Sequence, residues 1–196
     1  DSGGRCTRGS SMNIGNQKRY SIGAMIFHWL IAVLVIVNWR IAESAEHLSG
    51  PEKGAVFANH KALGMLILVL TLGRLAWRFT HPLPSLPNNY APWERMLARA
   101  THVIFYVLLV GLPLGGWLAS SLALRPVDFF GLFTIPMLPV GENKDLAGTI
   151  FDAHKTAGTI MIYLIGLHIL GALKHTFIDK DLGIFRMLPF GGKARE

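Results

Sequence analysis

The sequence predicts an all-α protein, a bundle of four helices that cross a membrane. Its 196 residues are 51% hydrophobic, and its mean hydropathy is +0.39. The apolar residues form four long blocks with charged residues between them, whereas the helices of a soluble protein show short amphipathic patterns. A block of about 20 apolar residues can span a bilayer as one helix. A chain of this length is expected to form one domain, which we place at residues 20–196.

The four predicted spans are residues 22–42, 62–79, 97–120 and 153–177. Pro82, Pro84 and Pro87 are expected to end the second helix, because proline cannot continue the helical hydrogen bonds. Pro113 lies among glycines inside the third span and predicts a kink there. Residues 121–152 are too interrupted by proline and glycine to span, so we expect a long loop that covers the outer face of the bundle.

The N-terminal segment is predicted to lie outside the bundle. Residues 1–19 are interpreted as a flexible tail. Residues 1–11 also fit a remnant of recombinant expression, with Met12 as the natural start. No secretory signal peptide is recognised, because the first apolar block is too long and has no small-residue cleavage site.

The net charge of +7 does not indicate nucleic-acid binding. The basic residues cluster at the ends of the apolar spans, where lipid headgroups and the positive-inside bias account for them. The same bias predicts that both termini are cytoplasmic, while most acidic residues fall on the outer side. The single cysteine, Cys6, excludes an internal disulfide, a cysteine-based zinc site and an iron–sulfur cluster.

Histidines in the apolar spans are the candidate functional residues, because an ionisable side chain is costly at membrane depth. His154 and His168 are fourteen residues apart in the fourth span, so they lie on nearly one helix face, about 21 Å apart. The predicted topology places His60 with His154 near the outer face and His28 with His168 near the cytoplasmic face. Each pair comes from two helices, as bis-histidine ligation of a haem requires. The sequence therefore predicts two haems.

Several alternatives remain open on the residues alone. A membrane histidine can instead hydrogen-bond between helices. Zinc would need all its ligands at one point, whereas these pairs are separated by most of the membrane. His102 and His175 could replace either inner ligand, or could bind a propionate or a quinone. His47 and His81 fall in predicted loops and are expected to be solvated.

Cationic residues accompany both predicted haem sites. Lys61 and Lys155 each follow an outer histidine and could neutralise propionates, attract a small anion, or extend to the membrane interface. Arg74 and Arg78 lie one turn apart near the inner site and could bind propionates or lipid phosphate.

Six segments, in this order, resemble the bacterial cytochrome b561 family of dihaem four-helix membrane proteins. They are FHWL around His28, NHKALG around His60, THVIFYVLLVGLPLGGW around His102, the FFGLFTIPM loop, DAHKTAG around His154, and GLHILGALKH around His168 and His175. They cover nearly the whole chain from about Tyr20 onward. The loop and the RMLP motif at residues 186–189 resemble the superoxide oxidase type within this family.

The resemblance implies two haems b, one between His60 and His154 and one between His28 and His168, in a multi-pass protein of the bacterial inner membrane. It further implies that the protein oxidises superoxide on the periplasmic side and reduces membrane ubiquinone. Lys61, Lys155 and Arg40 would then steer superoxide to the outer haem.

A second function is compatible with the same bundle. It is a haem-b membrane anchor that relays electrons between the quinone pool and a partner dehydrogenase or hydrogenase subunit. Membrane lipid is a partner in both cases, and the oligomeric state stays open between a monomer and a homo-oligomer.

Overall fold

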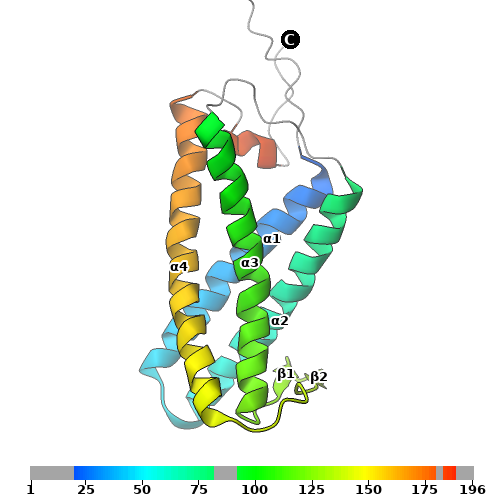
Figure 1. Cartoon of the computed structure of the whole chain (residues 1–196), viewed down its shortest axis with the longest axis vertical. Coiled ribbons are helices and arrows are strands. Elements are labelled where there is room, and N and C mark those ends of the chain that lie inside the picture. Colours follow the sequence, from blue (N-terminus) through cyan, green and yellow to red (C-terminus); the bar gives the residue numbers. More distant parts are fainter. Residues whose placement is uncertain (1–19, 82–91, 180–182, 189–196) are drawn as a thin grey trace, which may run out of the picture.

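The computed structural model of the chain describes residues 20–81, 92–179 and 183–188, and it confirms the predicted helical bundle. Four long helices run along the molecule (Figure 1): α1 (Ile22–Ser44), α2 (Gly50–Thr80), α3 (Pro92–Leu122) and α4 (Lys144–Phe177). Each is long and apolar enough to cross a membrane. The 3-10 helix η2 (Ala45–His47) joins α1 to α2, and a second one, η3 (Gly183–Met187), follows α4. The predicted tail and the prolines at 82, 84 and 87 lie outside the described residues.

Three helices begin earlier than their hydropathy predicted, and α3 does so by five residues, at Pro92 rather than residue 97. α2 begins at Gly50 rather than residue 62, and α4 at Lys144 rather than residue 153. Their first turns are polar but suited to a helix start, because Pro51 occupies the first turn of α2 and Asn143 caps α4 by accepting a hydrogen bond from the Leu146 amide. The predicted spans put His60 just before one helix and His154 at the start of another; this is wrong, since each lies ten residues inside its helix.

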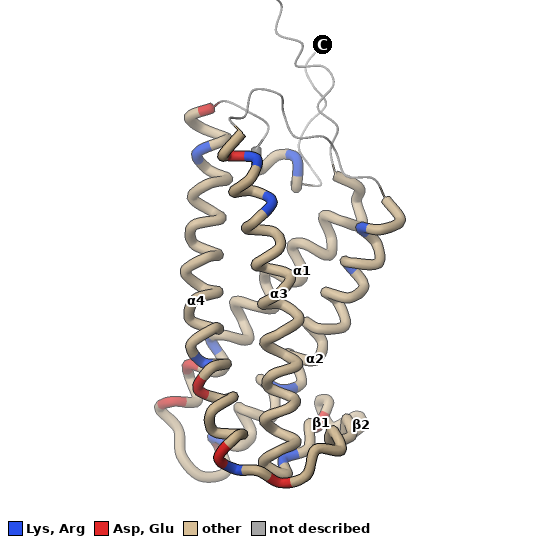
Figure 2. The backbone as a smooth tube through the Cα atoms, viewed as in Figure 1, with Lys and Arg blue, Asp and Glu red and all other residues tan. Residues whose placement is uncertain are grey.

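The charged residues gather at the two ends of the bundle and leave its middle free of charge (Figure 2). We call the end with η2 and the β hairpin the outer end, and the end with η3 the inner end. Most acidic residues of the described chain lie at the outer end: Glu43, Glu46, Glu52, Asp128, Glu142, Asp145 and Asp152. Four crossings bring the start of α1 and the end of α4 to the same, inner end (Figure 1).

An apolar layer occupies the middle of the bundle, and every long helix contributes to it. The buried residues of this layer are Ile31, Val35, Ile67, Leu109 and Met161. Met161 lies seven residues from both His154 and His168, so the layer falls midway between the two histidine levels of α4. α3 continues through Pro113, which lies just beyond this layer.

The loop between α3 and α4 holds a short β hairpin that the all-α prediction did not include. Strands β1 (Val127–Phe129) and β2 (Phe133–Ile135) pair antiparallel. Phe130 and Gly131 adopt positive φ angles in the turn, and the Gly131 amide donates to the Asp128 carboxylate at 2.7 Å. The loop does not span, as predicted, and it lies against the outer ends of α2 and α3. Trp117 Nε1 fixes it by donating to the Pro136 carbonyl at 3.1 Å.

Candidate functional site

The outer histidines lie next to each other between α2 and α4. The ring centroids of His60 and His154 are 6.0 Å apart, with an angle of 82° between the ring planes. His60 Nδ1 is 3.1 Å from the backbone carbonyl of Asn38 on α1. Because a carbonyl can only accept, His60 Nδ1 carries the proton and Nε2 keeps a free lone pair.

Glycines make the room beside this outer pair. A Cβ atom on Gly116 of α3 would lie 3.3 Å from His154 Cε1, so the absent side chain lets the imidazole pack against the α3 backbone. His154 Nδ1 is buried and has no hydrogen-bond partner among the described residues. Gly64 and Gly158 follow the two histidines by one turn. A Cβ on Gly64 would meet only Asn38, and one on Gly158 would meet nothing within 4 Å.

The inner histidines form a second pair between α1 and α4. The ring centroids of His28 and His168 are 6.3 Å apart, at an interplanar angle of 69°. His102 on α3 lies at the same distance from His168, 6.3 Å between centroids. His102 Nδ1 is hydrogen-bonded at 2.6 Å to the Ala98 carbonyl of its own helix, which holds the ring back against α3.

The spacing of both pairs fits a metal ion between two imidazoles. A bond from a metal ion to an imidazole nitrogen is about 2 Å, and that nitrogen lies about 1 Å from the ring centre. Two imidazoles on opposite sides of one ion therefore have centroids about 6 Å apart. The centroid distances of 6.0 and 6.3 Å match this spacing. The residues present thus fit haem iron at both levels.

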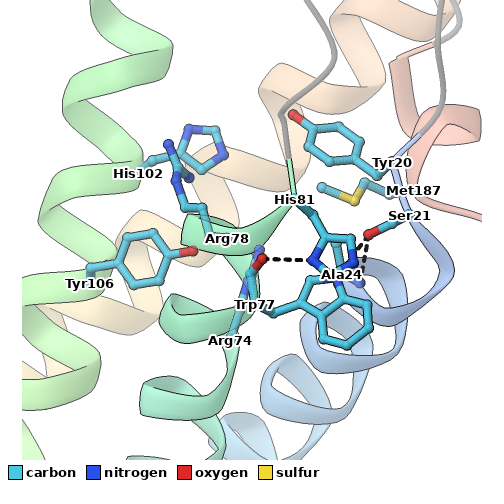
Figure 3. Close-up of a pocket in the computed structure, with 10 residues that line it drawn as sticks. All are labelled: Tyr20, Ser21, Ala24, Arg74, Trp77, Arg78, His81, His102, Tyr106 and Met187. Atoms are coloured by element: carbon cyan, nitrogen blue, oxygen red, sulfur yellow. Dashed lines mark hydrogen bonds between the residues drawn. The ribbon is translucent and has the colours of Figure 1, made fainter.

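A polar pocket lies beside the inner pair, where α1, α2, α3 and η3 meet (Figure 3). Arg74 and Arg78 approach the ring of Tyr106 from α2, with their guanidinium carbons 5.8 and 5.7 Å from its centroid. His102 lies on the same side, and Tyr20 and Met187 lie on the opposite side. The two arginines and the phenol supply donors for a carboxylate or another anionic oxygen group.

His81 lines this pocket as well, and the prediction that it is solvated in a loop is wrong. Its ring stacks on Trp77, with centroids 4.1 Å apart and planes 5° apart. Trp77 Nε1 in turn donates to Ser21 Oγ at 3.0 Å, which ties the end of α2 to the start of α1. His47, the other predicted loop histidine, is exposed in η2.

An ionic cluster fastens the inner ends of α3 and α4. Lys174 Nζ lies 2.8 Å from Glu94 and 3.0 Å from Asp179, and His175 Nδ1 lies 2.7 Å from the same Asp179 carboxylate. Hydrogen bonding from Lys174, with a smaller contribution from His175, holds the pKa of the Asp179 carboxyl below its usual range. His175 therefore faces a carboxylate beyond the end of α4.

The three predicted steering cations all have partners. Lys155 pairs with Glu46, which ties α4 to η2, and Arg40 pairs with Glu43 within α1. Lys61 Nζ donates to the Pro126 carbonyl at 2.8 Å, just before the β hairpin. The hydrogen-bond partner of Lys61 is thus an uncharged carbonyl. The charges of Lys155 and Arg40 are instead neutralised by carboxylates.

Two polar residues near these sites were missed by the sequence reasoning. Asn38 is only 8% exposed, and its side-chain oxygen has no hydrogen-bond partner among the described residues. A lone amide in the apolar run IAVLVIVNWRIA was the available signal. Tyr106 could not have been found in this way, because its role depends on the two arginines of another helix.

Comparison with known proteins gives a consistent family match. Residues 19–190 match the family described as prokaryotic cytochrome b561. The chain is 32% identical to "Cytochrome b561 homolog 2" of Escherichia coli K12, over 87% of this chain and 92% of that protein. It is 31% identical to "Probable superoxide oxidase CybB" of Yersinia pestis, over 88% of this chain and 97% of that protein.

Proposed function

This chain belongs to the prokaryotic cytochrome b561 family of electron-transfer membrane proteins, and we propose that it oxidises superoxide and reduces membrane ubiquinone. The balanced reaction takes two superoxide anions, one quinone and two protons to two dioxygen molecules and one quinol. The observation that carries the proposal is the presence of two histidine pairs on opposite sides of the apolar layer. The ring centroids within the pairs are 6.0 and 6.3 Å apart. One chain then has an electron entry point and an exit point.

The two histidine pairs are proposed to hold two haems. Proteins of this family bind haem b, which supplies one-electron chemistry when it is bound. His60 and His154 would hold the outer haem, and His28 and His168 the inner one. We prefer His28 to His102 as the partner of His168, because His102 lines the inner pocket, where it can act on a bound ligand, whereas His28 does not line it.

At the outer end, cationic side chains would attract superoxide. Among the three candidates, Lys61 is expected to contribute most, because its partner is a carbonyl rather than a carboxylate. Lys155 and Arg40 are expected to contribute less, since each charge is compensated by a glutamate.

At the inner end, Arg74 and Arg78 would bind the carboxylates of the inner haem, and the adjoining surface would receive the quinone. Quinone reduction consumes protons, and His102 and His175 are placed to pass them. The pocket lined by His81, His102 and Tyr106 has a volume of about 40 Å³, which is room for a few water molecules. His175 reaches the aqueous side through Asp179. This assigns proton delivery to the inner end.

The protein would lie in the bacterial inner membrane with its inner end in the cytoplasm. The basic residues of α2, α3 and α4 at that end support this orientation through the positive-inside bias. The outer end, with its hairpin, would then face the periplasm, where superoxide is oxidised.

Two measurements test the proposal. Pyridine haemochrome analysis should give two haems b per chain, and one or none would contradict the ligand assignment. Stopped-flow mixing of the oxidised protein with superoxide should reduce haem faster than superoxide decays by itself. Lys61→Gln should slow this step and weaken its dependence on salt. Haem reduction no faster than spontaneous decay, together with co-purification of a stoichiometric dehydrogenase subunit, would favour the membrane-anchor function instead.

A further inference from the structure

Asn38 is a buried polar residue that the proposed electron path does not use. It lies in α1, one residue before Trp39, and only 8% of its surface is exposed. Its side-chain oxygen is fully enclosed and has no hydrogen-bond partner among the described residues. An amide oxygen buried without a partner costs roughly 1–3 kcal/mol, which a bound hydrogen-bonding group would offset.

The position of Asn38 indicates which group would bind its amide. The Asn38 backbone carbonyl accepts the Nδ1 hydrogen of His60 at 3.1 Å. Its side-chain nitrogen lies 3.9 Å from the position that a Cβ on Gly64 would take, one turn after His60. The backbone of Asn38 thus fixes the proton of one outer histidine, while its side chain lies beside Gly64, where a Cβ would meet no other residue within 4 Å.

We propose that Asn38 is a positioning residue of the outer haem site. Its backbone holds the His60 ring with Nε2 directed to the metal, and its carboxamide hydrogen-bonds a carboxyl group of the haem. The oxygen and nitrogen of the amide exchange places by rotation, so the NH₂ group can donate to an ionised carboxylate. This inference rests on the proposed function, because it requires a haem between His60 and His154.

Among the described residues, only Asn38 combines a buried side chain, an unpartnered side-chain oxygen and a hydrogen bond to an outer histidine. Thr71 on α2 is also fully buried and its hydroxyl also has no partner, but it lies on the inner side of Ile67, beyond the apolar layer. Thr71 is therefore a control: another buried residue with an unpartnered side-chain oxygen, at a different level of the bundle.

The test measures haem retention in a His168→Ala background, in which only the outer haem is expected. Asn38→Leu removes the amide and keeps the side-chain volume. The rate of haem transfer to excess apomyoglobin should rise roughly tenfold to a hundredfold, as expected for the loss of a hydrogen bond to a charged group. Asn38→Gln keeps the amide and should stay within about threefold of the parent, and Thr71→Val should leave the rate unchanged.

A second readout separates positioning from general stability. Loss of the amide removes a donor beside a carboxylate, so Asn38→Leu in the otherwise native chain should lower the midpoint potential of one haem and leave the other unchanged. An Asn38→Leu protein with the parent's haem-transfer rate and both potentials unaltered would overturn the inference. If the His168→Ala parent itself retains no haem, the proposed ligand assignment fails, which is a distinguishable result.

Discussion

Gly116 offers a direct test of the outer site, because its neighbour Gly115 provides a control on the same helix. A Cβ on Gly116 would lie 3.3 Å from Cε1 and 3.5 Å from Nδ1 of His154. A Cβ on Gly115 would lie 3.9 Å from Ile150 Cγ2, which is an ordinary van der Waals contact. Gly116→Ala thus presses on the imidazole, whereas Gly115→Ala adds the same methyl group without strain.

Two terms bear on the expected magnitude. Alanine is favoured over glycine inside a helix by about 1 kcal/mol, and both variants gain this term. Overpacking in a buried contact costs about 1–3 kcal/mol, and only Gly116→Ala incurs it, because a ligating His154 cannot move away. The propensity term stabilises the haem-free and the haem-bound fold alike and cancels in the affinity, so the overpacking cost of about 1–3 kcal/mol corresponds to a loss of outer-haem affinity of roughly fivefold to 150-fold.

The assay is haem loss to excess apomyoglobin, followed at the Soret band for the purified protein. Gly116→Ala should show one faster phase that accounts for about half of the haem, and Gly115→Ala should match the unsubstituted protein. If the two variants lose haem at the same rate, His154 is not held against Gly116 as a ligand, and the reasoning is refuted.

Alanine substitutions should separate the two proposed haem sites. His154→Ala and His168→Ala should each leave one haem, the double variant should bind none, and His102→Ala should keep both. Pyridine haemochrome quantification checks this, and retention of two haems by His168→Ala would contradict it. Gly23→Ala should destabilise the bundle by about 1–3 kcal/mol, because its Cβ would lie 2.5 Å from the Trp77 ring. A Cβ on Gly148 would meet no atom within 4 Å, so Gly148→Ala should not destabilise the bundle. Thermal unfolding of both variants in detergent checks this. Because its folded-state pKa is lowered, Asp179 should stabilise the end of α4 at pH values above its ordinary pKa and lose this effect as the pH falls through the lowered value. Hydrogen exchange of the last turn of α4 should rise over that acidic range, and Asp179→Asn should abolish the dependence.

The sequence was sufficient to predict the four helices, because apolar blocks of membrane-spanning length leave few alternatives to a helix. It also predicted which histidines meet. His60 with His154 and His28 with His168 follow from counting residues along alternating helices, because α2 and α4 both run from the outer to the inner end and α1 runs the other way. What hydropathy could not provide was the start of α2 and of α4, because their first turns are polar and begin outside the apolar stretch.

The rest of the site depends on contacts between helices, which no spacing along one helix encodes. The contact of Tyr106 with two arginines and the bond of Trp77 to Ser21 require the relative rotation of neighbouring helices. The hairpin was missed for a different reason. Its three-residue strands are short, and Val127 becomes buried only because the loop folds back against α2.

The apolar layer explains how one bundle could carry electrons without carrying protons. Its five buried residues offer no hydrogen-bonding side chain, and it lies midway between the two histidine levels, about 10 Å along α4 from each. Electron tunnelling does not need polar groups, whereas proton transfer needs a chain of hydrogen bonds. In the proposed reaction, electrons that enter at the outer pair therefore cross the layer alone. The protons that complete quinol must come from the inner end, where His81, His102 and His175 are located.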